Sequence, residues 1–454
     1  MPRNLLPILA LLCGTLFLFS GNGLHGLLLP VRGTHEGYSN EMLGLLGTSW
    51  ASGFVLGCFF APSLIRRIGH ARAFSVFVAL IAIVALTTGI IIDDIVWVAL
   101  RAMTGFCIAG TSMIIESWLN ERATNESRGA IFSFYIAITL IGVVGGQMSL
   151  ALGDISTQTL FLACGIFYCL AILPTTMSNA ATPQPLKAVK LDLPTLFRTS
   201  PVSFFGILLI GIANGAFGTL GAVFGARAGL SQSSIALMMS LTIFAGALAQ
   251  FPAGRLSDRI DRRHVLAGLS GVASLAGLLI VILHPFDAVN LIPLIVFYGA
   301  AANALYPIAV AHANDFAAPE DFVKVSGGLL LLFGIGTIIG PTIGGPVMTL
   351  YGPHFLFAVT ALAHLSITLW AIFRSRMRAP IPVEERESYT TVPMGTTPAL
   401  TPEASALDPR AVAEDTPSED NPAGDTPDEA AAEAEAVPEG LAEADPAERE
   451  EERQ

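Results

Sequence analysis

Long apolar runs separated by short polar breaks fill the chain from residue 1 to residue 378. A run of about 20 apolar residues is long enough to cross the hydrocarbon core of a bilayer as a helix. Helices are expected rather than strands, because a helix satisfies every backbone group within its own segment. The pattern predicts twelve membrane-spanning helices, near residues 5–28, 41–64, 73–92, 95–117, 129–151, 158–177, 203–226, 233–254, 265–284, 289–312, 326–350 and 355–374.

The charges in the breaks are distributed unevenly between the two sides of the predicted membrane. With a cytoplasmic N-terminus, the cytoplasmic segments carry 18 Lys and Arg residues, whereas the opposite side carries only Arg32 and Arg227. Such an excess marks cytoplasmic loops. The pattern therefore predicts an even number of spans with both termini cytoplasmic, and we expect a bacterial inner membrane.

A polar stretch with four prolines and two lysines, residues 178–202, divides the spans into two groups of six. We therefore predict an all-α membrane protein of two pseudo-symmetric bundles, residues 1–177 and 203–378, joined by a cytoplasmic linker. Residues 379–454 are rich in Ala, Glu and Pro and have almost no aromatic residues. Such a segment buries too little apolar surface to offset its chain entropy, which predicts a disordered acidic tail.

Composition agrees with this division. Only 13% of the residues are charged, against about 25% in soluble globular domains. The net charge of −12 comes from the tail, at −17, whereas residues 1–378 carry +5. The basic residues recur in short loops rather than on one face, which argues against nucleic-acid binding.

All five cysteines lie in apolar runs, as buried thiols do, so we expect no disulfide framework and no metal site.

Two similar charged loops, which begin at Pro62 and Gly254, occupy matching places in the two halves, as an internal duplication predicts. The loop after the eighth span reads Gly254-Arg-Leu-Ser-Asp258-Arg259-Ile-Asp261-Arg262-Arg263. It resembles the G-x-x-x-D-R-x-G-R-R signature of the major facilitator superfamily, with Asp261 in place of glycine. The loop after the second span keeps Arg67, Gly69 and Arg72 of this signature, but it has Pro62 in place of the first glycine and Arg66 in place of the aspartate.

The resemblance implies that these loops take part in gating between two states of a transporter. An acidic side chain at a helix end can pair with arginines and cap a neighbouring helix. The residues to which this role carries over are Asp258, Arg259, Arg262, Arg263, Arg67 and Gly69. The alternative is plain topology, because basic loops are expected on the cytoplasmic side of any membrane fold.

A glycine-rich stretch around Gly340 and Pro341 in the eleventh span resembles a signature that the superfamily's antiporters carry in span 5. Small residues at four-residue spacing favour close helix packing with a pliable kink at Pro341. The same feature could serve gating. The fifth span here has glycines but lacks the proline, which argues against an antiporter.

The resemblance also implies a central cavity lined mainly by spans 1, 4, 7 and 10. Arg101, with Gly105 four residues later, resembles the R-x-x-x-G signature of span 4, and an arginine inside a span is costly unless it faces a cavity or a partner. Alternatively, Arg101 extends to the headgroups, and the amides bond neighbouring helices. The candidate substrate-binding residues are Asn22, His25, Trp50, Arg101, Gln147, Asn214, Gln250, Asn303 and Tyr306.

Two residues could carry a coupling proton. His25 can change charge near neutral pH, and Glu116 is a carboxylate within the fourth span. Alternatively, His25 lies at the periplasmic interface, and Glu116 is an interfacial carboxylate that pairs with a loop arginine. Our hypothesis is that a proton gradient acts through one of them.

These features predict a secondary transporter of a small organic solute, monomeric as the superfamily implies. A single interior arginine suits a neutral or anionic solute better than a polycation. The chain has no G-x-x-x-x-G-K-[ST], no HExxH and no GxSxG in a suitable context. We therefore expect no cofactor and no enzyme activity. The alternative is a non-transporting sensor or scaffold with the transporter fold, in which the acidic tail binds a partner.

Overall fold

The structure is a computed structural model that describes residues 6–123, 127–176, 193–317 and 322–378, together with Pro382, Arg386 and Thr401. Most of the predicted linker, and the tail apart from those three residues, lies outside this description. The described residues form helices and turns and contain no strand.

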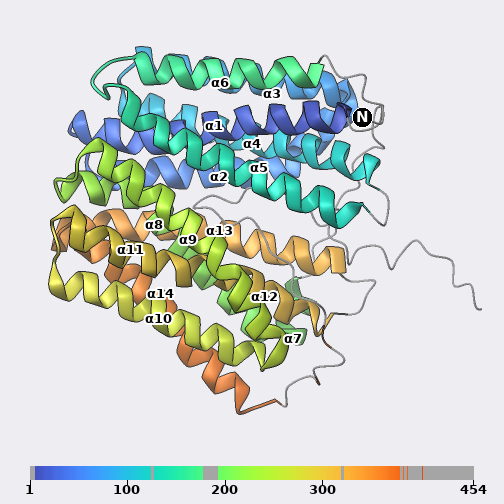
Figure 1. The fold of residues 1–454 in the computed structure, drawn as a ribbon, viewed down its shortest axis with the longest axis vertical. Coiled ribbons are helices and arrows are strands. Elements are labelled where there is room, and N and C mark those ends of the chain that lie inside the picture. The colour runs from blue at the N-terminus through green and yellow to red at the C-terminus, as the bar shows by residue number, and fades with distance from the viewer. Residues whose placement is uncertain are drawn as a thin grey trace, which may run out of the picture. The chain divides into compact units, whose positions relative to one another are not determined.

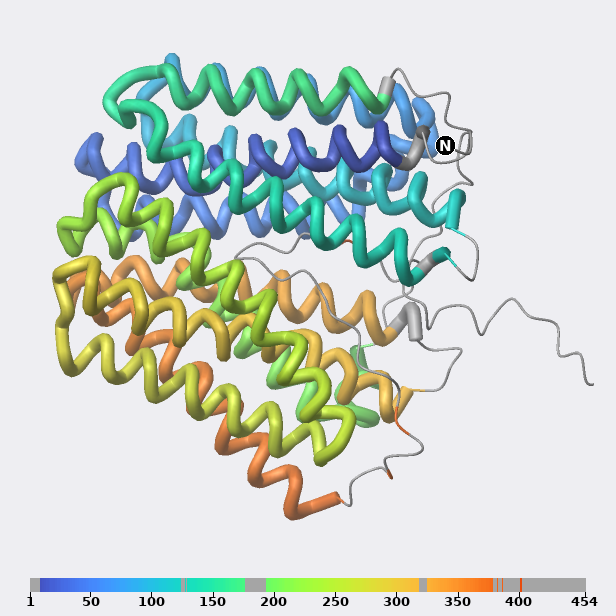
Figure 2. The backbone as a smooth tube through the Cα atoms, in the orientation of Figure 1, coloured from blue at the N-terminus to red at the C-terminus, as the bar shows by residue number. Residues whose placement is uncertain are grey.

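The first half of the fold consists of six long helices and one 3-10 turn. Figures 1 and 2 show these helices in blue to green as one group. Their bounds are α1 Leu6–His35, α2 Asn40–Ile68, α3 His70–Ile90, α4 Asp94–Arg122, α5 Arg128–Ser149, η1 Leu150–Leu152 and α6 Thr159–Thr176.

The second half begins with a short helix in the predicted linker and continues through six spans, drawn in green to orange in Figure 1. The bounds are α7 Leu193–Thr199, α8 Pro201–Arg227, α9 Gln232–Arg259, α10 Arg262–Leu283, α11 Ala288–Asn303, α12 Leu305–Asn314, α13 Phe322–Tyr351, η3 Pro353–Phe355 and α14 Leu356–Ser375.

The prediction of twelve membrane-spanning helices is confirmed. Eleven helices in the described residues are long and apolar enough to cross a membrane, and Thr159–Thr175 is a shorter apolar helix. The tenth span departs from the prediction because it is broken at Ala304 into α11 and α12. Pro307 explains the break, since it has no N–H to donate to the carbonyl oxygen of Asn303.

Matching turns in the two halves show the internal duplication. Gly37 and Gly229, which are equivalent positions of the repeat, have φ of +83° and +82°, a region that glycine adopts without strain. Two residues later, Ser39 and Ser231 cap α2 and α9, and each side chain accepts a 3.2 Å hydrogen bond from the backbone N–H three residues on. The duplicated sequence therefore forms duplicated local structure.

Glycines also allow equivalent close helix contacts within each half. A Cβ on Gly146 of α5 would lie 2.0 Å from the carbonyl oxygen of Ser20 in α1. A Cβ on Gly340 of α13 would lie 2.1 Å from the carbonyl oxygen of Ile212 in α8. Both positions therefore require glycine, as close packing of membrane helices predicts. In the structure, Gly340 holds α13 against α8.

Hydrogen bonds between the two halves gather at one end of the helices, called here the closed end and defined by the turns 36–39, 153–158 and 228–231. The opposite end, which carries the turns after α2 and α9, is called the linker end. At the closed end, polar groups of α2 and of the turns meet groups of α8, α9 and α13. The pairs are Asn40 with Thr349 at 3.2 Å, Thr48 with Thr342 at 2.9 Å, Arg227 with the Tyr38 carbonyl oxygen at 2.8 Å, and Gln232 with the Gly153 carbonyl oxygen at 2.7 Å.

Candidate functional site

A cavity lies between the two halves toward the closed end. Its walls come from α1, α2, α4 and α5 of the first half and from α8 and α9 of the second. It holds about 670 Å³ of space between atoms, open solvent included. Four of the nine predicted substrate-binding residues line it together: Asn22, Trp50, Arg101 and Gln147.

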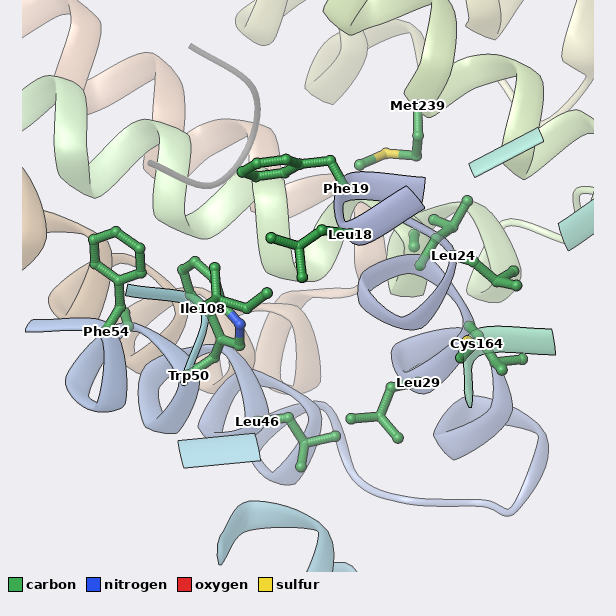
Figure 3. Close-up of a cluster of buried hydrophobic side chains, with 14 of the residues drawn as sticks. Leu18, Phe19, Leu24, Leu29, Leu46, Trp50, Phe54, Ile108, Cys164 and Met239 are labelled. Carbon is green, nitrogen blue, oxygen red and sulfur yellow. The ribbon is translucent and has the colours of Figure 1, made fainter. Parts of the chain in front are cut away.

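Close packing of α2 against α4 positions Trp50 and Arg101. A Cβ on Gly105 would lie 2.0 Å from the carbonyl oxygen of Trp50, and one on Gly53 would lie 1.9 Å from that of Ala102. The glycine of the R-x-x-x-G pattern therefore brings α2 close enough for Arg101 to lie 5.8 Å from the centre of the Trp50 ring, a cation–π distance. Figure 3 shows the same indole beside the Phe54 ring.

The guanidinium of Arg101 is buried, with 8% of the residue exposed. Gly26 of α1 leaves room for it, since a Cβ there would lie 3.6 Å from Arg101 Nη2. Within the described part of the chain, Arg101 forms no ion pair, and its Nη1 has no hydrogen-bond acceptor. The Arg101 guanidinium is therefore a buried cation in the cavity wall. No described residue serves as its counter-ion.

Gln147 connects the halves beside this cavity, where its Oε1 accepts a 3.3 Å hydrogen bond from Ser240 of α9. Asn214 of α8 is buried one turn before the lining residue Gly218, and its Nδ2 has no partner in the described structure.

The remaining predicted substrate-binding residues are buried but do not line this cavity. His25, 1% exposed, packs edge-on against the rings of Phe161 and Tyr168, at 6.5 and 6.4 Å. Asn303 donates a 3.5 Å hydrogen bond to the Thr242 carbonyl oxygen within the second half. Gln250 and Tyr306 are also buried in that half.

Glu116 is fully buried near the linker end of α4. Tyr135 of α5 donates a 3.0 Å hydrogen bond to its Oε1. The hydroxyl of Thr401, a tail residue that is itself buried, donates to its Oε2. Two hydroxyls from separate segments therefore converge on one carboxyl group, and the tail contributes one of them.

The loop after α9 is held within the second half by buried ion pairs. Arg262, 1% exposed, pairs through Nε with Asp315 at 2.8 Å, just after α12. Asp258 lies 3.6 Å from Arg262 and is about half exposed, whereas Arg259 is exposed. The aspartate of the signature is thus the outer partner of Arg262, and Asp315 is the buried partner.

Asp261, which replaces a signature glycine, caps the start of α10. It accepts a 3.0 Å hydrogen bond from the backbone N–H of Arg263 and pairs with that guanidinium at 2.6 Å. Although burial alone would raise it, the hydrogen bonds from Arg263 hold the pKa of Asp261 below its ordinary value of 3.8. Arg263 also donates to the carbonyl oxygens of Arg374 and Arg378, so α10 is tied to the end of α14.

The equivalent loop after α2 is built differently. Arg66 and Arg67 are exposed, and Arg66 donates to Ser63 at 3.1 Å. Gly69 has φ of +86° and makes the turn into α3. His70, the equivalent of Arg262 in the repeat, is buried and lies 3.5 Å from the Ser117 hydroxyl of α4.

No group of three His, Cys, Asp or Glu side chains in the described ranges could hold a metal ion.

Comparison with known proteins decides the family. The model of the Major Facilitator Superfamily matches residues 11–231 and again residues 203–413, well over half of the sequence. The chain belongs to the Major Facilitator Superfamily. As a member of this superfamily of transporters, it is a multi-pass membrane protein.

Relatives and solved structures agree with membership of the Major Facilitator Superfamily. An uncharacterized MFS-type transporter of Yersinia pestis (strain Pestoides F) is 27% identical over 359 residues, which cover 78% of this chain and 92% of the relative. The crystal structure of the nucleoside transporter NupG has a TM-score of 0.67 at 14% identity, over 81% of this chain and 98% of NupG. An inward-facing, occupied structure of a bacterial homolog of the human lysosomal transporter Spinster has a TM-score of 0.66 at 16% identity, over 86% and 99% of the two chains. At these identities the two structures show the shared fold alone.

Three residues at these sites were not predicted from the sequence. Asp315 is an acidic residue just after the tenth span, and a search for partners of the charged loops could have found it. Tyr135 lies among apolar residues and Thr401 lies in the low-complexity tail, so neither gives a local signal that connects it to Glu116.

Proposed function

We propose that this chain is a secondary active transporter that moves a small organic solute by alternating access of its two halves. The cavity supports this proposal most directly, because both halves line it and hydrogen bonds between the halves gather toward one end of it. Separation of the halves at the closed end would expose the same cavity to the other side of the membrane.

The arginine-rich loops support a bacterial inner-membrane location with both termini and the linker end in the cytoplasm. In that orientation the described state is closed toward the periplasm. A single cysteine placed at the exposed residue Arg67 should react with a membrane-impermeant maleimide only from the cytoplasmic side. Labelling of that cysteine in intact cells would contradict this orientation.

A proton gradient is the proposed driving force, with Glu116 and His25 as the candidate carriers. Glu116 is the better placed, because hydroxyls of Tyr135 and Thr401 already bond its carboxyl oxygens at a buried position. A buried carboxyl group can take up and release a proton as the helices around it rearrange. His25 is buried beside the cavity wall and has no hydrogen-bond partner in the described structure.

The test is solute-induced proton movement in liposomes that contain the purified protein and an internal pH indicator. A panel of small acids, amides, sugars and nucleosides is applied from outside under a pH gradient. We expect at least one solute to move protons in wild type, and Glu116→Gln, or a double variant with His25→Asn, to abolish this movement. Asp94→Asn is the matched control, because it changes a carboxylate at the closed end of α4, the helix that carries Glu116. Undiminished proton-driven uptake in the double variant would remove the coupling proposal.

A non-transporting sensor or scaffold is the alternative, favoured by the contact of the tail residue Thr401 with Glu116. Removal of residues 387–454 separates the two functions, because it keeps Arg386, which bonds the Ile260 carbonyl oxygen. A transporter should retain uptake without this segment. A scaffold should show no uptake in either form and should lose its partner.

We propose that the protein acts as a monomer, which the mass of the purified complex in nanodiscs would test.

A further inference from the structure

The cavity wall holds an excess of hydrogen-bond donors without acceptors. Within the described residues, Arg101 Nη1 and Trp50 Nε1 have no partner, although both residues are more than nine-tenths buried and line the cavity. One turn from the lining, Asn214 Nδ2 has none either. Buried polar groups are normally hydrogen-bonded. A ligand that supplies acceptors would satisfy these donors.

The charge of the wall indicates an anionic acceptor. Arg101 is the one basic residue in the lining, and the lining contains no Asp or Glu. A buried arginine is stabilised by a paired anion, and carboxylates match its planar fork with two parallel hydrogen bonds. Arg32, another buried arginine of the first half, already has such a partner in Glu36 at 2.5 Å. Arg101 therefore differs from Arg32 in lacking a carboxylate from the described protein.

The rest of the wall indicates an apolar body beside the anionic group. Figure 3 shows Leu29, Leu46, Trp50 and Met239 in this part of the molecule, and all four line the cavity. The Trp50 indole adds apolar aromatic surface to this wall, although the Phe54 ring stacks on it at 5.3 Å and the Arg101 guanidinium lies over it. One cation without a second one nearby matches a single negative charge.

We propose that the cavity binds a small organic acid as its monoanion, with the carboxylate on Arg101 and the apolar body against Trp50 and Met239. This inference rests on the proposed transport function, because it names the class of solute that the same cavity would carry. Amides and amines of the same shape are excluded by charge. An amide leaves the guanidinium without a counter-ion, and an amine adds a second positive charge beside it.

The test is calorimetric binding to the full-length protein in nanodiscs, with benzoate and hexanoate as the probes and benzamide and hexanamide as their neutral counterparts. Charge-assisted hydrogen bonds contribute enough that we expect each acid to bind about tenfold or more tightly than its amide. Arg101→Gln should remove this preference by weakening the binding of the acid about tenfold or more, and Arg101→Lys should restore part of it.

Arg374→Gln is the matched control. The Arg374 guanidinium lies over the Trp370 ring at 5.9 Å, almost the same geometry as Arg101 over Trp50, but outside the cavity. We expect this variant to bind the acids as wild type does. Loss of binding in both arginine variants would show a general effect of charge and would overturn the proposal.

Three results count against the anion site: equal binding of acid and amide, acid binding unchanged in Arg101→Gln, or no binding of either acid at millimolar concentration. Proton flux driven by an amide in the liposome assay would keep the transporter and reject the anion site. Acid binding that depends on Arg101, in a protein that moves no tested solute, would keep the site and reject transport. The two proposals therefore fail in distinguishable ways.

Discussion

The two halves of this protein share one pattern of helices, and among the buried arginines of the described structure Arg101 differs from the others in forming no ion pair. In the second half, Arg262 pairs with Asp315 at 2.8 Å and Arg263 pairs with Asp261 at 2.6 Å. In the first half, Arg101 is buried at the cavity without an ion pair in the described structure. The paired arginines fix the structure of their half, whereas the unpaired Arg101 is the residue to which we assign a ligand in our proposal.

The equivalent loops after α2 and α9 also differ in the charge of the contacts that anchor them. Arg262 and His70 occupy matching positions of the repeat, and each holds the helix after its loop against the fourth span of its half. Arg262 does so with a buried charge pair, and His70 with a 3.5 Å contact to Ser117. The loop of the second half is therefore the more firmly anchored one.

The largest expected effect comes from breaking the buried pair. Asp315→Ala should lower the free energy of unfolding by about 3–5 kcal/mol, because it leaves the Arg262 guanidinium buried without that partner. His70→Ala should cost only about 1 kcal/mol. Thermal unfolding of the detergent-solubilised protein, followed by tryptophan fluorescence, measures both.

Asp258→Ala is the control for that experiment, since Asp258 is the half-exposed partner of the same arginine. Exposed ion pairs contribute about 1 kcal/mol or less. Equal losses for Asp258→Ala and Asp315→Ala would contradict the assignment of Asp315 as the structural partner.

The second prediction compares the two buried arginines directly. Arg101→Met should leave stability unchanged or raise it by about 1–2 kcal/mol, because it removes a buried charge that lacks a counter-ion. Arg262→Met should lower the free energy of unfolding by several kcal/mol, because it removes the buried guanidinium that pairs with the Asp315 carboxylate. Melting temperatures of the two variants without ligand decide this, and destabilisation by Arg101→Met as large as that by Arg262→Met would show that Arg101 is structural.

The sequence predicted the architecture well because hydrophobic periods and loop charges depend on local composition. Twelve spans and the internal repeat follow from such patterns, and the duplicated caps at Ser39 and Ser231 show how local sequence reproduces them. The break at Ala304 was missed because a proline inside an apolar run is compatible with both a kink and an interruption.

The residues of the cavity wall were predictable only where the sequence pattern marks them. Arg101 and Trp50 were found because a charge and a large ring interrupt apolar runs. Their mutual geometry depends on Gly105 and Gly53, whose close contacts between α2 and α4 are long-range properties. The tail partner of Glu116 could not be predicted, since Thr401 lies far away in the sequence and has no local pattern around it.

The third prediction concerns acid stability of the loop after α9. Because the folded pKa of Asp261 is below its ordinary value of 3.8, ionised Asp261 stabilises the fold above that value. This contribution is lost as the pH falls through the folded pKa. Asp261→Asn should therefore lower stability by about 1 kcal/mol at pH 7, and the difference from wild type should vanish in strong acid. Unfolding measured across pH 7 to 3 tests this, and a constant difference would contradict it.

The smallest expected effect concerns Thr401, a described tail residue that contacts the first half. Glu116 receives the Thr401 hydroxyl, whereas the equivalent position in the second half is the apolar Ile308. If Glu116 carries the proton, loss of this donor disfavours the ionised carboxylate and makes proton release harder, and Thr401→Val should lower proton-driven uptake about twofold, a barrier change of about 0.4 kcal/mol. Thr401→Ser keeps the hydroxyl and should behave as wild type. Identical rates in the valine and serine variants would mean that the hydrogen bond does not affect transport, and the contrast between the halves would then rest on their arginines alone.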